Sequence, residues 1–195
     1  MKKILFTALI YVLFITGCNN KDNALTVPHE KLPEDYSLAD AKEDGCVVYE
    51  NGDITFGKEI WDGFVASTGV KGDCSVRYCN YYTIEDASKY APEYYEEIKD
   101  EYPKMYVHDL TWNGEVYTVR WFENSVENVR EYKYLMKYED VPESNSATYS
   151  LCTRYVLTND DTVSWEDISD SMYSSLSMAF IDHLTVYSDY VYKDE

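Results

Sequence analysis

The chain contains 195 residues, of which 17 are Lys or Arg and 36 are Asp or Glu, so its formal net charge at pH 7 is −19. This acidic balance argues against nucleic acid as a partner, because proteins that neutralise phosphates need a basic surface. Hydrophobic residues make up 45% of the chain and aromatic residues 16%, which excludes a disordered or collagen-like protein and favours a folded core.

Residues 1–18 have the pattern of a bacterial export signal. Lys2 and Lys3 precede the uncharged residues 4–15, which would extend about 18 Å as a helix and are too short for a hydrocarbon core of about 30 Å. The following Ile15-Thr16-Gly17-Cys18 resembles a lipobox, which implies cleavage before Cys18 and lipidation of its thiol. We therefore expect a chain that is anchored through lipid on Cys18 to the extracytoplasmic face of the cell membrane.

The signal peptide is thus assigned to residues 1–17. Residues 18–35 are expected to be the lipidated Cys18 and a flexible tether, because they contain few large apolar side chains. Residues 36–195 are expected to form a single globular domain. After cleavage, 15 basic and 36 acidic residues remain, a formal charge of −21.

The domain opens with a predicted hairpin. Residues 46–50 and 53–56 are rich in β-forming side chains and flank Asn51-Gly52, in which both residues tolerate positive φ. A short helix follows and ends at Gly69. Its apolar face consists of Ile60, Trp61, Phe64 and Val65.

Residues 74–82 are predicted to form a strand, with Val76 and Tyr78 on one face and Arg77, Cys79 and Tyr81 on the other. After a break, a second helix is expected to begin at Pro92 and to end before Pro103.

A second hairpin is predicted for residues 105–112 and 115–123, which flank Asn113-Gly114. Residues 130–138 alternate polar and apolar side chains and are predicted to form one half-buried strand, and residues 148–157 repeat that pattern. Ser164 and Asp167 resemble a capping box at the start of a long terminal helix that covers the sheet. Its apolar stripe is predicted to be Trp165, Ile168, Met172, Leu176, Ala179, Phe180 and Leu184.

This order lacks the regular repetition of a parallel sheet and predicts an α+β fold. The simplest architecture is a twisted antiparallel sheet with β-hairpins, covered by helices mainly on one face.

Four segments of the chain carry a resemblance, and they are Gly45-Cys46-Val47-Val48-Tyr49-Glu50-Asn51-Gly52-Asp53-Ile54, Trp61-Asp62-Gly63-Phe64, Val76-Arg77-Tyr78 and Tyr82-Thr83-Ile84-Glu85. In these segments the chain resembles small uncharacterised lipoproteins of Firmicutes, including gut Clostridia. In these proteins a hairpin follows that is built on a Leu-x-x-x-Gly pattern, here Leu110-Thr111-Trp112-Asn113-Gly114. The resemblance implies an envelope location and one compact domain, and it brings no catalytic residues. Residues 86–104 are longer than the corresponding connection.

Four cysteines follow Cys18, and none forms a Cys-x-x-Cys pair. Cys74 and Cys79 fall on opposite faces of one predicted strand, so a disulfide between them is excluded. Cys79 with Cys152 is the pairing to test first, since both share polar-face neighbours, and buried free thiols are the alternative.

No pattern in the sequence indicates catalysis, a cofactor or a resident metal. His29 falls in the expected tether, His183 at the edge of the terminal helix, and His108 points away from its neighbour Asp109 in a strand. Residues 159–162 lack a calcium-loop pattern and are read as a turn. The abundant carboxylates are read as a solvated acidic surface, with a hydrolase that uses two of them as an alternative.

Tyr is the most distinctive residue, with 21 occurrences. Exposed tyrosines flanked by carboxylates can stack on sugar rings, and Tyr90, Tyr94, Tyr95 and Tyr102 are a candidate surface of this kind. The alternative is that Tyr simply fills strand and boundary positions.

Together these patterns favour a binding or accessory module of the cell envelope over an enzyme. The expected partners are a basic envelope protein or, alternatively, a neutral glycan, because a charge near −21 repels anionic polymers.

Overall fold

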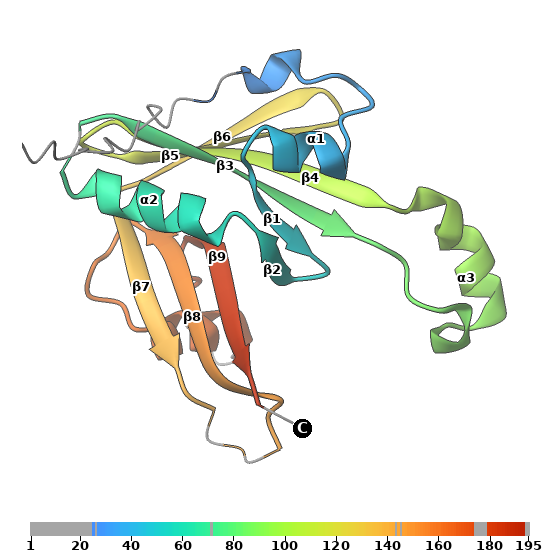
Figure 1. The fold of residues 1–195 in the computed structure, drawn as a ribbon. Coiled ribbons are helices and arrows are strands. Elements are labelled where there is room, and N and C mark those ends of the chain that lie inside the picture. Colours follow the sequence, from blue (N-terminus) through green and yellow to red (C-terminus); the bar gives the residue numbers. More distant parts are fainter. Residues whose placement is uncertain are drawn as a thin grey trace, which may run out of the picture.

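The computed structural model describes Leu25 and residues 27–70, 72–142, 144, 146–173 and 179–193. The predicted signal peptide and Cys18 lie outside these residues. Within them the chain has the expected α+β fold, in which most neighbouring strands are antiparallel. The strands form two sheets instead of one, and the smaller sheet extends away from the larger one (Figure 1).

The larger sheet has six strands in the order β2-β1-β3-β4-β5-β6. Their bounds are β1 Val47–Glu50, β2 Asp53–Phe56, β3 Cys74–Tyr82, β4 Lys104–Trp112, β5 Tyr117–Glu123 and β6 Val126–Tyr132. Neighbours are antiparallel except β1 and β3, which run parallel. The chain passes through β2 and helix α2 between them, which supplies the long crossover that a parallel pair requires.

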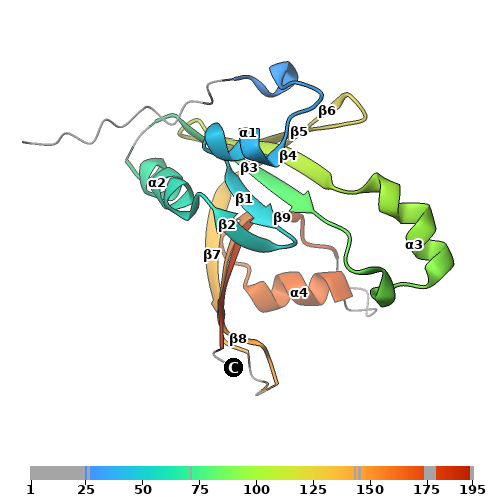
Figure 2. The same cartoon turned by 45° about the vertical axis from the view of Figure 1, so that its right-hand side comes forward.

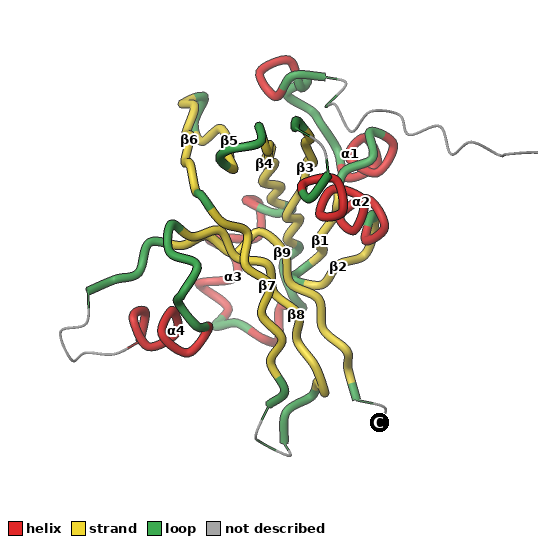
Figure 3. Tube along the Cα trace, turned by 90° about the vertical axis from the view of Figure 1, so that its left-hand side faces the viewer, coloured by secondary structure: helices red, strands yellow, loops and turns green. Residues whose placement is uncertain are grey.

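The smaller sheet is antiparallel, in the order β7-β8-β9. Its strands are β7 Tyr134–Asp140, β8 Tyr149–Thr158 and β9 His183–Tyr192. Helices α2 (Lys58–Thr68) and α4 (Trp165–Tyr173) lie on opposite faces of this sheet (Figures 2 and 3). The remaining helices are α1 Leu38–Glu43, α3 Pro92–Ile98 and the short 3₁₀ helices η1 His29–Lys31, η2 Ala87–Lys89 and η3 Lys99–Glu101.

The main core joins both sheets to α2. Trp61 of α2 is fully buried and stacks on Tyr187 of β9, with 4.7 Å between the ring centres. Leu110 and Val119 line the same core from the larger sheet, and Leu157 lines it from the smaller one. Burial of each large apolar side chain stabilises the fold by about 1.5–3 kcal/mol, so this shared core holds the two sheets together.

Both predicted hairpins are confirmed, with different turns. Asn51 and Gly52 have φ of 53° and 97° and form a two-residue turn between β1 and β2. In the second hairpin Trp112 pairs with Tyr117, so four residues form the loop. The Asn113 side chain accepts hydrogen bonds from the backbone N–H groups of Glu115 and Val116, both at 2.9 Å, and replaces a tight turn.

The prediction of a single strand over residues 130–138 is wrong. The chain leaves the larger sheet after Tyr132, and Tyr134 begins the smaller one. Between them, the backbone N–H of Lys133 donates to the Asn159 side chain at 3.2 Å instead of to a strand. Polar and apolar alternation continues through this junction, so periodicity alone does not reveal it.

The prediction of one long terminal helix is also wrong, because Ala179 and Phe180 of its predicted stripe are not helical. The Ser164–Asp167 capping box is present, with the Ser164 N–H donating to Asp167 at 2.9 Å and the Asp167 N–H donating to Ser164 at 3.1 Å. However, Leu184 lies in β9, where it pairs with Leu157 of β8. The β-branched and aromatic residues after His183 favour a strand that gains cross-strand pairs. Leu176 of the predicted stripe lies outside the described residues.

Candidate functional site

A segment of residues 83–103 leaves the end of β3 and returns to the start of β4, where Tyr82 and Lys104 pair. We call this segment the arm. Its helix α3 contains no buried residue and stands clear of the sheets (Figures 1 and 2). At the base of the arm, Asn51 and Thr83 exchange two hydrogen bonds of 2.9 Å. These bonds tie the first residue of the arm to the turn between β1 and β2.

Three of the four candidate tyrosines lie together on the arm. The ring centre of Tyr90 is 6.1 Å from that of Tyr94 and 6.0 Å from that of Tyr95. Tyr94 is 53% exposed. The first turn of α3 brings these side chains together because Pro92 starts the helix two residues after Tyr90, as its position in the sequence predicts.

The fourth tyrosine, Tyr102, lies against a cation. The ammonium of Lys104 sits 5.0 Å from the centre of the Tyr102 ring and 2.6 Å from the carboxylate of Glu101. The hydrogen bond to Glu101 raises the pKa of Lys104. This arrangement combines a cation–π contact with an ion pair on the surface of the protein.

Carboxylates surround the tyrosines. The arm holds seven acidic residues, Glu85, Asp86, Glu93, Glu96, Glu97, Asp100 and Glu101, and two basic ones, Lys89 and Lys99. Lys99 pairs with Glu96 at 2.6 Å, which raises the pKa of Lys99. The arm therefore carries a formal charge of −5.

Tyr82 and Tyr106 are exposed tyrosines that the sequence analysis missed. They are 39% and 50% exposed and meet edge to face at the base of the arm, 6.1 Å apart. Their alternation within predicted strands indicates sheet faces, and only the exposure of both side chains in the structure shows that they are not covered.

The expected disulfide between Cys79 and Cys152 is contradicted, because both residues are free thiols in different sheets. Cys79 packs with Cys46 and Ala41 on the face of the larger sheet that α1 covers. A hydrogen bond between the two thiols lowers the pKa of Cys46 and raises that of Cys79. The predicted pairing assumed that both strands belong to one sheet. Because the strands lie in separate sheets, Cys79 and Cys152 are not neighbours.

His108 and Asp109 point to opposite faces, as predicted. The His108 ring stacks on Tyr78 with 4.7 Å between centres, and burial lowers the pKa of His108 to about 4. Asp109 instead faces Arg77, whose Nε donates to it at 2.6 Å. His183 lies at the start of β9, with its ring nitrogen 2.7 Å from the Ile181 carbonyl.

The part of the expected tether that the structure describes lies against the larger sheet. The His29 ring packs 4.8 Å from Phe122 of β5, and Arg77 donates to the Val27 carbonyl at 2.9 Å. Burial lowers the pKa of His29. Residues 27–31 thus form a strap across the sheet.

The predicted turn at residues 159–162 is present. Asp160 accepts hydrogen bonds from the Thr162 hydroxyl at 2.6 Å and from the Thr162 backbone N–H at 2.9 Å, and these bonds lower the pKa of Asp160. Across the described ranges, no three or more His, Cys, Asp or Glu residues gather in a way that could hold a metal ion.

No known family model, curated protein or solved structure matches the chain. In the portion of the chain that the structure covers, no helix is long and apolar enough to cross a membrane.

Proposed function

We propose that this protein is a membrane-anchored, extracytoplasmic binding or accessory module of the cell envelope, and that its arm binds a basic protein or peptide. The observation that carries the proposal is the contact of Lys104 with Tyr102 and Glu101. Within the chain itself, the arm binds an ammonium group through one tyrosine ring and one carboxylate.

The same two residue types are repeated on the outward side of the arm. Tyr94 is largely exposed, and the neighbouring Glu93 and Glu97 are exposed as well. A Lys or Arg side chain of a partner can lie over a tyrosine ring while it pairs with a nearby carboxylate. The overall charge of −19 steers such a partner toward the surface, which raises the association rate at low salt.

The location is supported by the pattern of Lys2, Lys3, the apolar run and Cys18, and by the resemblance to small lipoproteins. In this proposal the lipid on Cys18 holds the module at the membrane, and the arm recruits the partner.

The test compares two double variants of the full chain in detergent, with an octalysine peptide and a neutral oligosaccharide as probes. Glu93→Gln/Glu97→Gln removes two charges from the arm. Glu127→Gln/Glu131→Gln removes the same charge from β6. We expect the arm variant to bind octalysine about fivefold more weakly, and the β6 variant to bind like the original protein. Affinity in both proteins should fall as salt rises.

Equal weakening in both variants would mean that the affinity for octalysine depends on the net charge alone. This result would overturn the role of the arm. Tight binding of the oligosaccharide that does not depend on salt would overturn the choice of a basic partner. Capture of basic proteins from an envelope extract by the original chain, and their loss with the arm variant, would then identify the partner.

A further inference from the structure

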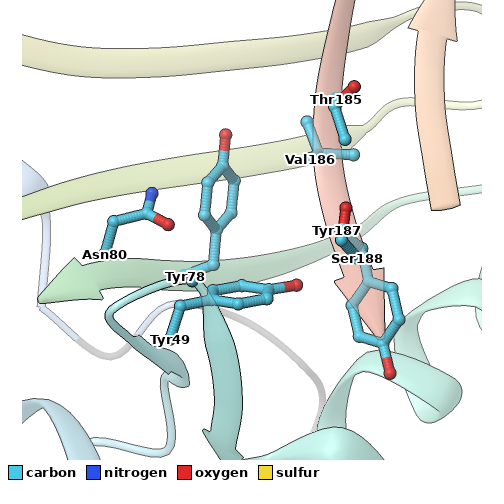
Figure 4. A pocket seen from close by; sticks show the side chains of 8 residues that line it. Tyr49, Tyr78, Asn80, Thr185, Val186, Tyr187 and Ser188 are labelled. Atoms are coloured by element: carbon cyan, nitrogen blue, oxygen red, sulfur yellow. The ribbon is translucent and has the colours of Figure 1, made fainter. Parts of the chain in front are cut away.

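A pocket of about 120 Å³ lies where the two sheets meet (Figure 4). Tyr49 of β1 and Tyr78 and Asn80 of β3 line it from the larger sheet, and Thr185 and Ser188 of β9 line it from the smaller one. Asn80 lies only three residues before the arm, because β3 leads into it, but no residue that lines the pocket belongs to the arm itself. A cavity of about 150 Å³ holds benzene, so this pocket of about 120 Å³ can enclose a short polyol or one edge of a larger ring.

Irregular strand pairing shapes both sides of the pocket. On β9, Tyr187 pairs with Tyr155 and Thr185 pairs with Val156, so Val186 is an extra residue in the strand. The pairing of β1 with β2 also shifts, between Val48 and Tyr49. Such bulges redirect side chains and are common beside binding sites.

Two polar contacts hold β9 in place, one to the larger sheet and one to helix α2. The Tyr192 hydroxyl donates to Asp53 of β2, and Lys58 of α2 pairs with Asp189 of β9. On the opposite wall, the Tyr78 ring is fixed by its stack on His108. The pocket is therefore formed before any ligand binds.

The hydroxyl of Tyr49 is the unusual group. Tyr49 is 5% exposed, and among the described residues its hydroxyl has no hydrogen-bond partner. It extends toward β9 (Figure 4). The Ser188 backbone opposes the rise in the pKa of Tyr49, but it does not meet the Tyr49 hydroxyl with the geometry of a hydrogen bond. Burial is the main influence and raises the pKa of Tyr49, so the hydroxyl stays protonated and can donate.

A buried donor without a partner is costly and is usually explained by a missing one. The side chains that line the pocket are all uncharged, so a charged ligand would lose its water without gaining a counter-ion. Tyrosine rings match the apolar face of a ring or short carbon chain, and the Asn80 amide both donates and accepts hydrogen bonds.

We propose that this pocket binds a small uncharged ligand rich in hydroxyl groups, either a polyol or a single sugar ring, and that the Tyr49 hydroxyl donates a hydrogen bond to it. The residues of this site are different from those that the proposed function assigns to the arm. A ligand of this size reaches a Kd of about 1 mM.

The test uses the full chain in detergent with glycerol, glucose, glucosamine and glucuronate as probes, and measures binding by ligand-observed and protein-observed NMR. Tyr49→Phe removes only the hydroxyl that points into the pocket. Tyr187→Phe is the matched control, since its hydroxyl points away from the pocket (Figure 4). We expect the neutral probes to bind at least threefold more weakly to Tyr49→Phe and unchanged to Tyr187→Phe. The melting temperature of ligand-free Tyr49→Phe should equal or exceed that of the original protein.

Tighter binding of glucose than of glycerol would indicate a sugar ring, and the reverse would indicate a polyol. The proposal is overturned if neither neutral probe binds, if glucosamine or glucuronate binds more tightly than glucose, or if both Tyr variants lose affinity equally. A lower melting temperature for Tyr49→Phe together with unchanged binding would assign the hydroxyl a structural role instead.

Discussion

Arg77 and Asp109 face each other at the centre of the larger sheet, where they are 4% and 6% exposed. Nε of Arg77 donates to Asp109 at 2.6 Å and a terminal nitrogen of Arg77 donates at 2.9 Å, so the pair is bidentate. Burial opposes the charged guanidinium, but the hydrogen bonds and charge of Asp109 outweigh it and raise the pKa of Arg77. Each residue therefore depends on the other for its place in the sheet.

We expect Asp109→Asn to lower the free energy of unfolding by about 3 kcal/mol, because Arg77 would remain as a buried charge without its counter-ion. Urea denaturation measures this change. Glu127→Gln is the control, because Glu127 pairs with Arg120 at 2.9 Å on the surface, with both side chains nearly half exposed. Its effect should stay below about 1 kcal/mol. Equal effects of the two substitutions would contradict the assignment.

His108 should make the fold sensitive to acid. Burial lowers its pKa to about 4 in the folded protein, whereas an unfolded His titrates near 6.5. Between these values the unfolded chain binds more protons, so stability is complete above about pH 6.5 and falls as the pH drops toward about 4. His29, whose pKa is also lowered by burial, acts in the same direction.

We expect His108→Phe, which keeps a ring against Tyr78, to reduce the stability lost between about pH 7 and about pH 4.5 by about 2 kcal/mol. Urea denaturation of both proteins at the two pH values measures the difference. An unchanged pH dependence in the variant would show that other groups cause the acid sensitivity.

Among the elements, the two hairpin loops each contain a glycine at positive φ. Gly52 has a φ of 97° in a two-residue turn, and Gly114 has a φ of 91° inside a loop that Asn113 organises. Gly52→Val and Gly114→Val should each lower the free energy of unfolding by about 1 kcal/mol or more, because a β-branched residue is strained at positive φ. Thermal and urea denaturation check this.

Gly63→Ala in the middle of α2 is the control for both turns. A Cβ at Gly63 has no heavy atom within 4 Å, and the backbone there is helical. This substitution should stabilise the protein by about 0.5–1 kcal/mol. Unchanged melting of both turn variants would mean that neither loop needs its glycine.

Most local elements could be predicted from the sequence because their signals are local. Asn51-Gly52, Pro92 and the Ser164–Asp167 pair set the ends of the elements in which they occur. The junction at Lys133 and the strand β9 could not be predicted in this way, since both depend on pairing with β8. The energy of strand pairing comes from residues distant in sequence. The apolar spacing up to Leu184 predicts a helix, but pairing with β8 places Leu184 in a strand.

The same distinction between local and distant signals applies to the candidate sites. Tyr90, Tyr94 and Tyr95 are close in sequence, so their grouping could be anticipated. Tyr49 and Ser188 meet only because the two sheets pack against each other, and no spacing in the sequence links them. The failed pairing of Cys79 with Cys152 has the same cause, since it assumed a single sheet.

For the whole molecule, the location rests on Cys18. We expect the original chain to incorporate a fatty-acid analogue when it is produced in a bacterium with lipoprotein processing, and Cys18→Ser to incorporate none. Gel fluorescence of the purified chains measures the label. Cys152→Ser, which alters a buried thiol, is the control and should label like the original chain. Equal labelling of the Cys18→Ser variant would refute lipidation at this site.

The strap formed by residues 27–31 shortens the reach of such an anchor. Val27 is held by Arg77, and it lies only nine positions after Cys18. Nine residues span at most about 30 Å, roughly half the length available had the chain been free as far as residue 35. A lipid on Cys18 would then keep the larger sheet in a thin layer next to the membrane. Within that layer the effective concentration of a membrane-bound partner is high, and molecules farther out are beyond the reach of the domain.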